Sequence, residues 1–186
     1  MPQVNPNELV LVLGGARSGK SSWALKYVEE RYHSYVFLAT ARVQDEEMAE
    51  RVRLHKKSRG LEWGLLEEPL EVAEAIGTKC ADYDCVLIDC ATIWLSNVMI
   101  EKGDKEVLNY GKVFLEALAE RKQAIVIVSN EVGMGVVPDH PLGRRFRDHA
   151  GFMNQEIAKM ADKVVFMVAG LPMFLKRDRE GSLSPE

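Results

Sequence analysis

A glycine-rich segment near the start of the chain has the residue types and the spacing of a phosphate-binding loop. It reads Gly14, Gly15, Ala16, Arg17, Ser18, Gly19, Lys20 and Ser21, which fits the pattern G-x-x-x-x-G-K-[ST]. In such a loop the glycines let successive backbone N–H groups point inward at phosphate oxygens, and the lysine reaches the β- and γ-phosphates. The alternative is a glycine-rich turn before a helix, in which the lysine is incidental.

Two oxygen-bearing side chains could hold Mg²⁺ beside these phosphates. Ser21 supplies a hydroxyl, and Asp89 ends the apolar run 85–89. Mg²⁺ keeps several water molecules and binds through few protein ligands together with phosphates. The sequence therefore predicts a nucleotide site in which Ser21 and Asp89 are the metal ligands. Alternatively, Asp89 caps the helix that follows it, because Asp is a favoured residue at helix N-termini.

Short apolar runs rich in Val, Ile and Leu alternate with longer segments of helical periodicity. This alternation is typical of parallel strands that are buried on both faces and joined by crossover helices. The expected strands are residues 9–13, 35–40, 85–89, 124–129 and 164–168, with a weaker one at 61–66. The expected helices are residues 18–31, 45–57, 69–76, 105–121 and 142–160. The glycine-rich segment and Asp89 then follow strands, at the edge where open α/β sheets bind ligands.

These elements predict an α/β fold of three layers (α/β/α), of the RecA-like P-loop NTPase type. The sheet should be mainly parallel, with an antiparallel edge near residues 166–176. A chain of 186 residues is short for two full domains. We therefore expect one domain over residues 1–186, with its core at about 8–175 and a polar tail at 176–186.

Composition argues against several classes of protein. Lys and Arg number 24 against 28 Asp and Glu, so the net charge of −4 gives no global field that would attract nucleic acid or an anionic membrane. The first residues lack the features of a secretory leader, and the longest apolar run, 164–175, is shorter than the span of about 20 residues that a bilayer needs. We expect a cytoplasmic location. Cys80, Cys85 and Cys90 fit no short-spaced zinc pattern and are predicted to be reduced core residues.

Further sequence blocks narrow the prediction. Besides residues 14–22 they are 39–41, 45–48 followed by Arg51, 55–56, 130–138 (Asn-Glu-Val-Gly-Met-Gly-Val-Val-Pro), 146–151 and 154–155. In content and order these blocks resemble the bifunctional adenosylcobinamide kinase and adenosylcobinamide-phosphate guanylyltransferase family, over residues 9–175. The resemblance implies an enzyme of cobalamin assembly that phosphorylates adenosylcobinamide with ATP or GTP. It would then transfer GMP from GTP to adenosylcobinamide phosphate, giving adenosylcobinamide-GDP.

The resemblance also implies roles for individual residues, and a homotrimer. His55 matches the nucleophile that carries GMP, and a histidine suits this role because its ordinary pKa of about 6.5 leaves a neutral ring nitrogen. Lys20, which the loop pattern places on the β- and γ-phosphates, is the other residue that we expect to be catalytic. The implied nucleotide-binding residues outside the loop 14–21 are Ala39, Thr40, Ala41, Lys56, Lys57, Ser58, Arg59, Glu67 and Asp89, with Mg²⁺ on Ser21 and Asp89.

Other interpretations stay open. From spacing alone, His55 is explained by an ordinary half-buried position on a helix face shared with Met48 and Val52. The enzyme could be a kinase that lacks guanylyl transfer, or the chain could be a nucleotide-dependent switch for a protein partner. The glycines of residues 130–138 would permit a close approach of backbone to a ligand, although a rigid turn between strand and helix also explains them.

Overall fold

The computed structural model describes residues 5–42 and 62–177, and a seven-stranded sheet runs through them. The strand order is β3-β2-β4-β5-β1-β6-β7. The strands are β1 (Leu9–Gly14), β2 (Tyr35–Ala39), β3 (Gly64–Glu67), β4 (Cys85–Asp89), β5 (Ala124–Asn130), β6 (Lys163–Val168) and β7 (Leu171–Lys176). The helices are α1 (Lys20–Glu29), α3 (Val72–Gly77), α4 (Ala91–Glu101), α5 (Val107–Ala119) and α6 (Pro141–Met160), with a 3-10 helix η1 (Asp104–Glu106). Neighbouring strands are parallel except β6 and β7, which are antiparallel.

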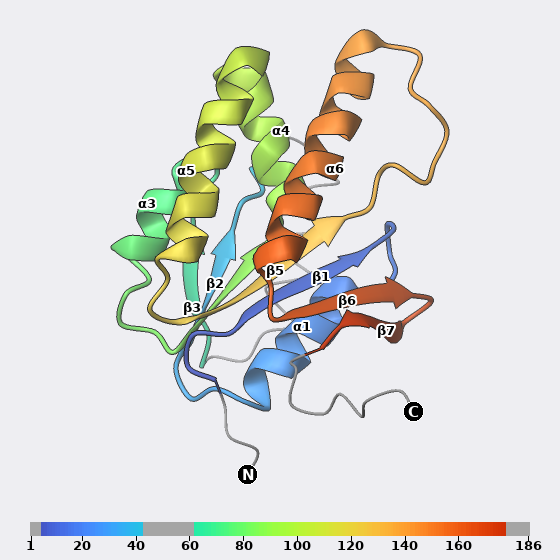
Figure 1. The fold of residues 1–186 in the computed structure, drawn as a ribbon. Helices are drawn as coiled ribbons and strands as arrows, with labels where there is room; N and C mark the ends of the chain where they lie inside the picture. Colours follow the sequence, from blue (N-terminus) through green and yellow to red (C-terminus); the bar gives the residue numbers. More distant parts are fainter. Residues whose placement is uncertain (1–4, 43–61, 178–186) are drawn as a thin grey trace, which may run out of the picture.

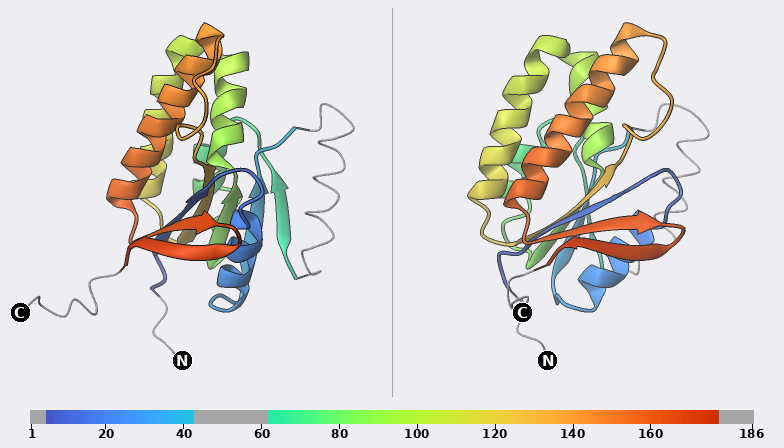
Figure 2. Two further views of the ribbon diagram at one scale, coloured as in Figure 1. Left: turned by 90° about the vertical axis from the view of Figure 1, so that its right-hand side faces the viewer. Right: turned by 45° about the vertical axis from the view of Figure 1, so that its right-hand side comes forward.

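Helices cover both faces of the sheet. Figures 1 and 2 show α3, α4, α5 and α6 on one face and α1 on the other. In β1, Leu9 and Leu11 belong to the core beneath the four helices, whereas Val10 and Val12 pack on the side of α1. A strand covered on both faces has no position for an exposed polar side chain, which explains its uninterrupted apolar sequence. The predicted three-layer architecture, the mainly parallel sheet and its antiparallel edge are confirmed.

Most predicted elements are present with shifted ends. The weak strand expected at 61–66 is β3, and the helix expected at 69–76 begins only at Val72. The helix expected at 105–121 is divided into η1 and α5. The helix expected at 45–57 lies outside the described residues.

The sequence prediction was wrong to leave out α4. Most of its side chains are buried, so the helix has no polar face and its sequence shows no amphipathic stripe. Trp94 packs its ring against Phe114 of α5, with ring centroids 4.7 Å apart. The indole Nε1 of Trp94 also donates a hydrogen bond to the carbonyl oxygen of Leu70 at 2.8 Å. Helix α4 is therefore held to α5 and to the segment before α3.

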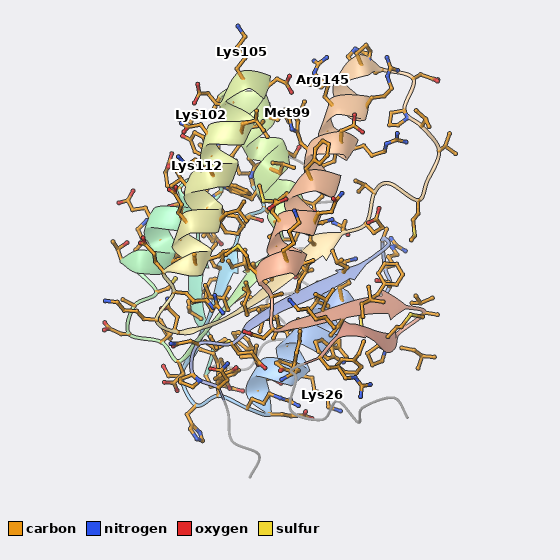
Figure 3. All side chains as sticks on the ribbon, viewed as in Figure 1. Lys26, Met99, Lys102, Lys105, Lys112 and Arg145 are labelled. Atoms are coloured by element: carbon orange, nitrogen blue, oxygen red, sulfur yellow. The ribbon has the colours of Figure 1, made fainter. Side chains whose placement is uncertain are left out.

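Asp104, an acidic residue of η1, links η1 to α6. The Asp104 carboxylate accepts from Arg145 Nε at 3.2 Å and lies 3.1 Å from His149 Nε2, both on α6. Figure 3 shows Lys105 and Arg145 at the same end of the helix layer. The contact gives His149, which lies within one of the sequence blocks, a structural partner.

The cysteines agree with a further expectation. Cys80, Cys85 and Cys90 are all buried free thiols, so the prediction of reduced core cysteines is confirmed. None of the helices in residues 5–42 and 62–177 combines the length and the apolar composition that crossing a bilayer requires.

Candidate active site

The glycine-rich loop connects the end of β1 to the start of α1. Gly14 has φ 151° and Gly19, the residue before the helix, has φ 93°. Arg17, between them, also has a positive φ of 55°. These values lie where glycine is favoured over other residues, so the spacing of the two glycines matches the two places where the chain turns. The loop thus has the curled backbone expected of a phosphate cradle.

Lys20, the first residue of α1, points back into this loop. Its Nζ donates to the carbonyl oxygen of Gly15 at 2.6 Å, and its side chain is only 6% exposed. Burial lowers the pKa of Lys20, whereas its charge interactions with Cys90 and Asp89 act in the opposite direction. The ammonium group therefore lies within electrostatic range of the end of β4. A lysine can bind phosphate oxygens, and a nearby carboxylate can hold the Mg²⁺ that accompanies a triphosphate.

The hairpin of β6 and β7 supports the loop from one side. The backbone N–H of Gly170, in the hairpin turn, donates to the carbonyl oxygen of Ser18 at 3.0 Å. A Cβ added to Gly19 would lie 3.2 Å from the Cα of Gly170. A Cβ added to Gly14 would lie 2.5 Å from the carbonyl oxygen of Met167 in β6. Sequence reasoning missed this support, because nothing in the local pattern links residues about 150 positions apart.

Asp89 is the last residue of β4, and the alternative that it caps the next helix is wrong. The N-cap of α4 is Cys90, whose Sγ accepts from the backbone N–H of Ile93 at 3.4 Å. The register of the sheet places Asp89 opposite Ala39 of β2, and Ala39 opposite Glu67 of β3. Asp89, Ala39 and Glu67 therefore form one row at the carboxyl ends of three neighbouring strands.

Thr40 lies behind this row. Its side chain is fully buried, and Oγ1 accepts from the backbone N–H of Cys90 at 2.8 Å and donates to the Cys90 carbonyl oxygen at 2.9 Å. Asn97 of α4 donates to the carbonyl oxygen of Thr40 at 2.9 Å. These bonds fix the end of β2 to the end of β4. Ala41 follows at a partly exposed position.

A polar network at the end of β5 completes the described site. Ser129 Oγ donates to Asn154 Oδ1 of α6 at 2.7 Å and lies 3.3 Å from Thr92 Oγ1 of α4. The backbone N–H of Asn130 donates to Thr92 Oγ1 at 2.7 Å, and Asn154 Nδ2 donates to the Asn130 carbonyl oxygen at 3.2 Å. Sequence reasoning quoted Asn130 and Asn154 but missed Thr92. Ser96 and Asn97 are also polar in the segment 91–101, so the hydroxyl of Thr92 gave no distinctive signal in the sequence.

The remaining predicted residues fall into two groups. Within the loop, Ala16 and Arg17 are exposed and Ser18 is buried, while Ser21 lies in the first turn of α1 at a partly exposed position. Ser18 Oγ makes no hydrogen bond to any residue that the structure describes. The second group lies outside the described residues, and it consists of His55, Lys56, Lys57, Ser58 and Arg59. The structure therefore brings together the loop, Asp89 and the row of strand ends, and does not place the proposed nucleophile.

Comparisons with known proteins give the same family as the sequence blocks. The family model described as cobinamide kinase / cobinamide phosphate guanyltransferase matches residues 10–175. The chain is 42% identical to the bifunctional adenosylcobalamin biosynthesis protein CobP of Pseudomonas aeruginosa, over 89% of this chain and 96% of that protein. It is 34% identical to the bifunctional adenosylcobalamin biosynthesis protein CobU of Salmonella typhimurium, over 90% of this chain and 99% of that protein.

A solved structure shares the fold. The flagellar accessory protein FlaH of Methanocaldococcus jannaschii superposes with a TM-score of 0.53 over 92% of this chain and 79% of its own, at 14% identity. At that identity the likeness concerns the fold alone. It agrees with the predicted α/β fold.

Proposed function

The chain belongs to the cobinamide kinase / cobinamide phosphate guanyltransferase family, and we propose that its one domain catalyses both reactions. In the first, adenosylcobinamide is phosphorylated by a nucleoside triphosphate, ATP or GTP. In the second, GMP passes from GTP to adenosylcobinamide phosphate. One observation carries the proposal: Lys20 is held against the Gly15 carbonyl oxygen inside the glycine loop and interacts electrostatically with Asp89 at the end of β4. The homotrimer and the cytoplasmic location stay predictions.

In the kinase step, the loop would hold the triphosphate through its backbone N–H groups and Lys20. The hydroxyl oxygen of adenosylcobinamide attacks the γ-phosphorus, the bond from that phosphorus to the β–γ bridging oxygen breaks, and the hydroxyl proton is released. The products are the phosphate ester and the nucleoside diphosphate. Lys20 exchanges its bond to the Gly15 carbonyl oxygen for one to phosphate and offsets the charge that grows on the leaving diphosphate.

Two residues fit the requirements of Mg²⁺. Ser21 offers a hydroxyl oxygen next to Lys20, and Asp89 offers a carboxylate within electrostatic range of the same lysine. A hydroxyl and a carboxylate are hard oxygen donors, and two protein ligands leave room for the water and phosphate oxygens that Mg²⁺ prefers. When bound there, Mg²⁺ would neutralise charge on the β- and γ-phosphates.

In the guanylyl transfer step, His55 is the proposed nucleophile. A ring nitrogen attacks the α-phosphorus of GTP, the bond to the α–β bridging oxygen breaks, and pyrophosphate leaves. A phosphate oxygen of adenosylcobinamide phosphate then attacks the same phosphorus and releases the histidine. Dividing one displacement into two is the usual advantage of a covalent carrier. Lys56, Lys57, Ser58 and Arg59 are proposed to contact the GTP.

Labelling with GTP tests the two-step proposal. With α-³²P-GTP, the wild type should acquire label that is stable in alkali and released in acid, as expected of a phosphoramidate. His55→Ala should lose this label and keep kinase turnover. Label retained in His55→Ala would reject the nucleophile. A wild type that phosphorylates adenosylcobinamide without ever being labelled would instead be a kinase alone.

The P-loop assignment is tested separately. Lys20→Ala should weaken triphosphate use in both half-reactions, and intact kinase turnover would show that the loop is not catalytic. A nucleotide-dependent switch would bind GTP and give no product from adenosylcobinamide. Product formation by the wild type therefore distinguishes an enzyme from a switch.

A further inference from the structure

Strand β5 lies between the two strands that carry the proposed phosphate-binding groups. Its neighbours are β1, which leads into the glycine loop, and β4, which ends in Asp89. The register pairs Asn130, the last residue of β5, with Gly14, and pairs Asp89 with Val128. Asn130 is thus two residues further along the sheet than Asp89, level with the first residue of the loop.

The backbone of Asn130 is firmly held. Its N–H donates to Thr92 Oγ1 at 2.7 Å, and its carbonyl oxygen accepts from Asn154 Nδ2 at 3.2 Å. The next residue, Glu131, donates its N–H to the carbonyl oxygen of Gly14 at 3.0 Å. The position of Asn130 relative to the loop is therefore fixed by neighbours in β1, α4 and α6.

The side chain of Asn130 is held more loosely than its backbone. Its Nδ2 donates to Thr92 Oγ1 at 3.3 Å and to Cys90 Sγ at 3.8 Å. A bond from an amide to a neutral sulfur is weak, and burial keeps the thiol neutral by raising the pKa of Cys90 to about 11. The amide can exchange this partner for a stronger, charged acceptor at little cost.

Lys20 connects this amide to the phosphate cradle. The Nζ of Lys20 donates to the carbonyl oxygen of Gly15, which follows Gly14, the residue paired with Asn130 in the sheet. The Asn130 residue and the Lys20 ammonium group consequently both lie at the end of the sheet where β1 leads into the glycine loop. A terminal phosphate held by Lys20 would therefore lie close to the Asn130 side chain as well.

We propose that Asn130 is a further catalytic residue of phosphoryl transfer, whose side-chain Nδ2 donates a hydrogen bond to a terminal phosphate oxygen of the bound triphosphate. The inference rests on the proposed function, because it requires the triphosphate to lie in the glycine loop. A neutral amide suits this place, since it has no proton to lose and stabilises negative charge that grows on the phosphate during transfer. Because a diphosphate lacks the γ-phosphate, this hydrogen bond would also distinguish a triphosphate from a diphosphate.

The test compares the affinities of GDP and of the β,γ-imido analogue of GTP by calorimetry in the full-length protein. In Asn130→Ala, GDP should bind within about twofold of the wild type, and the imido analogue should bind about 10- to 100-fold more weakly, as for a lost hydrogen bond to a charged group. The kinase kcat should fall about 100-fold or more, as for removal of one donor to a developing charge. Asn130→Asp, which keeps the size of the side chain, should lose at least as much, since a carboxylate repels the phosphate.

Asn109→Ala is the matched control. Asn109 is an exposed residue of α5 whose side-chain Nδ2 donates to Glu106 Oε2 at 3.4 Å, so the same substitution is made away from the glycine loop. The ratio of the two affinities in this variant should stay that of the wild type. The proposal is overturned if Asn130→Ala keeps the wild-type ratio and kcat, or if Asn109→Ala changes the ratio as much. Lys20→Ala distinguishes failure of the role of Asn130 alone from failure of the proposed function. If Lys20→Ala leaves both affinities unchanged, the glycine loop is not the triphosphate site, and the proposed function fails together with the role of Asn130.

Discussion

Replacing Gly14 by alanine tests whether the loop depends on its close contact with β6. The new Cβ would lie 2.5 Å from the carbonyl oxygen of Met167 and 2.6 Å from Ser18 Oγ, and the backbone φ is 151°. The serine side chain can rotate away, but the carbonyl oxygen belongs to a strand and cannot. Overpacking costs about 1–3 kcal/mol, and a backbone angle that side chains rarely adopt costs about 1–3 kcal/mol. We therefore expect Gly14→Ala to lower the free energy of unfolding by about 2–6 kcal/mol.

The neighbouring glycine supplies the control. A Cβ at Gly15 meets no atom within 4 Å, and the φ of Gly15 is not in the positive range. We expect Gly15→Ala to change the free energy of unfolding by no more than about 0.5–1 kcal/mol in either direction. The two variants differ by one position in the same loop, so chemistry and composition are matched.

Urea denaturation measures both variants, followed by tryptophan fluorescence. With a slope of about 2 kcal/mol per molar urea, the midpoint of Gly14→Ala should fall by about 1 M or more, at an unchanged slope. The midpoint of Gly15→Ala should stay within about 0.5 M of the wild type. If Gly14→Ala is as stable as Gly15→Ala, the loop does not press against β6 and the reasoning is refuted.

Three further predictions concern buried polar groups. Glu8 is 3% exposed and accepts hydrogen bonds from the hydroxyls of two tyrosines, so Glu8→Ala should lower the free energy of unfolding in urea by about 3–5 kcal/mol. Glu30→Ala, at an exposed position, should lower it by less than about 1 kcal/mol. Equal losses of stability in the two variants would contradict this reasoning. Thr40→Val should cost about 2–3 kcal/mol, because it removes both bonds to the Cys90 backbone, and a neutral result would show that these bonds contribute nothing. Burial raises the pKa of the Cys80 thiol to about 11, above the value of about 8.5 in the unfolded chain. The unfolded thiol then loses its proton first, so its contribution to stability is complete below about pH 8.5 and is lost between there and about pH 11. The pH dependence of stability in this window should be shallower in Cys80→Ala than in the wild type, and identical slopes would exclude the effect.

The sequence predicted those parts of the fold that have a local cause. Buried parallel strands are short and apolar, and the glycine loop is defined by the spacing of Gly14 and Gly19, where the backbone has positive φ. Helix α4 was not predicted because it is buried on most sides, so its sequence lacks the alternation of apolar and polar faces that marks an amphipathic helix. The helix expected at 105–121 is divided into η1 and α5, and no residue within it marks the division. Gly103, which has φ 92°, lies just before η1.

The candidate site was predictable only in part, for a related reason. Residues in a characteristic motif or at the end of an apolar run, such as Lys20 and Asp89, could be proposed for the candidate site from the sequence. Thr40 was expected against the nucleotide, but its hydroxyl is occupied by the Cys90 backbone, a contact between residues 50 positions apart. The hydroxyl of Thr92 is likewise occupied by a residue distant in the sequence, because it accepts from the backbone N–H of Asn130 in β5. Such contacts depend on strand order and register, which a single sequence does not specify.

The support of the loop from both sides has a consequence for ligand binding. The N–H of Glu131 bonds to the Gly14 carbonyl oxygen from the side of β5, and the N–H of Gly170 bonds to the Ser18 carbonyl oxygen from the side of β6, each at 3.0 Å. Folding of the sheet therefore orders the loop before any phosphate arrives. A ligand that meets an ordered loop does not have to supply the free energy of ordering it, about 1–2 kcal/mol per residue. Within the described site, the main exchange left to binding is that of Lys20, whose ammonium must leave the Gly15 carbonyl oxygen for a phosphate oxygen.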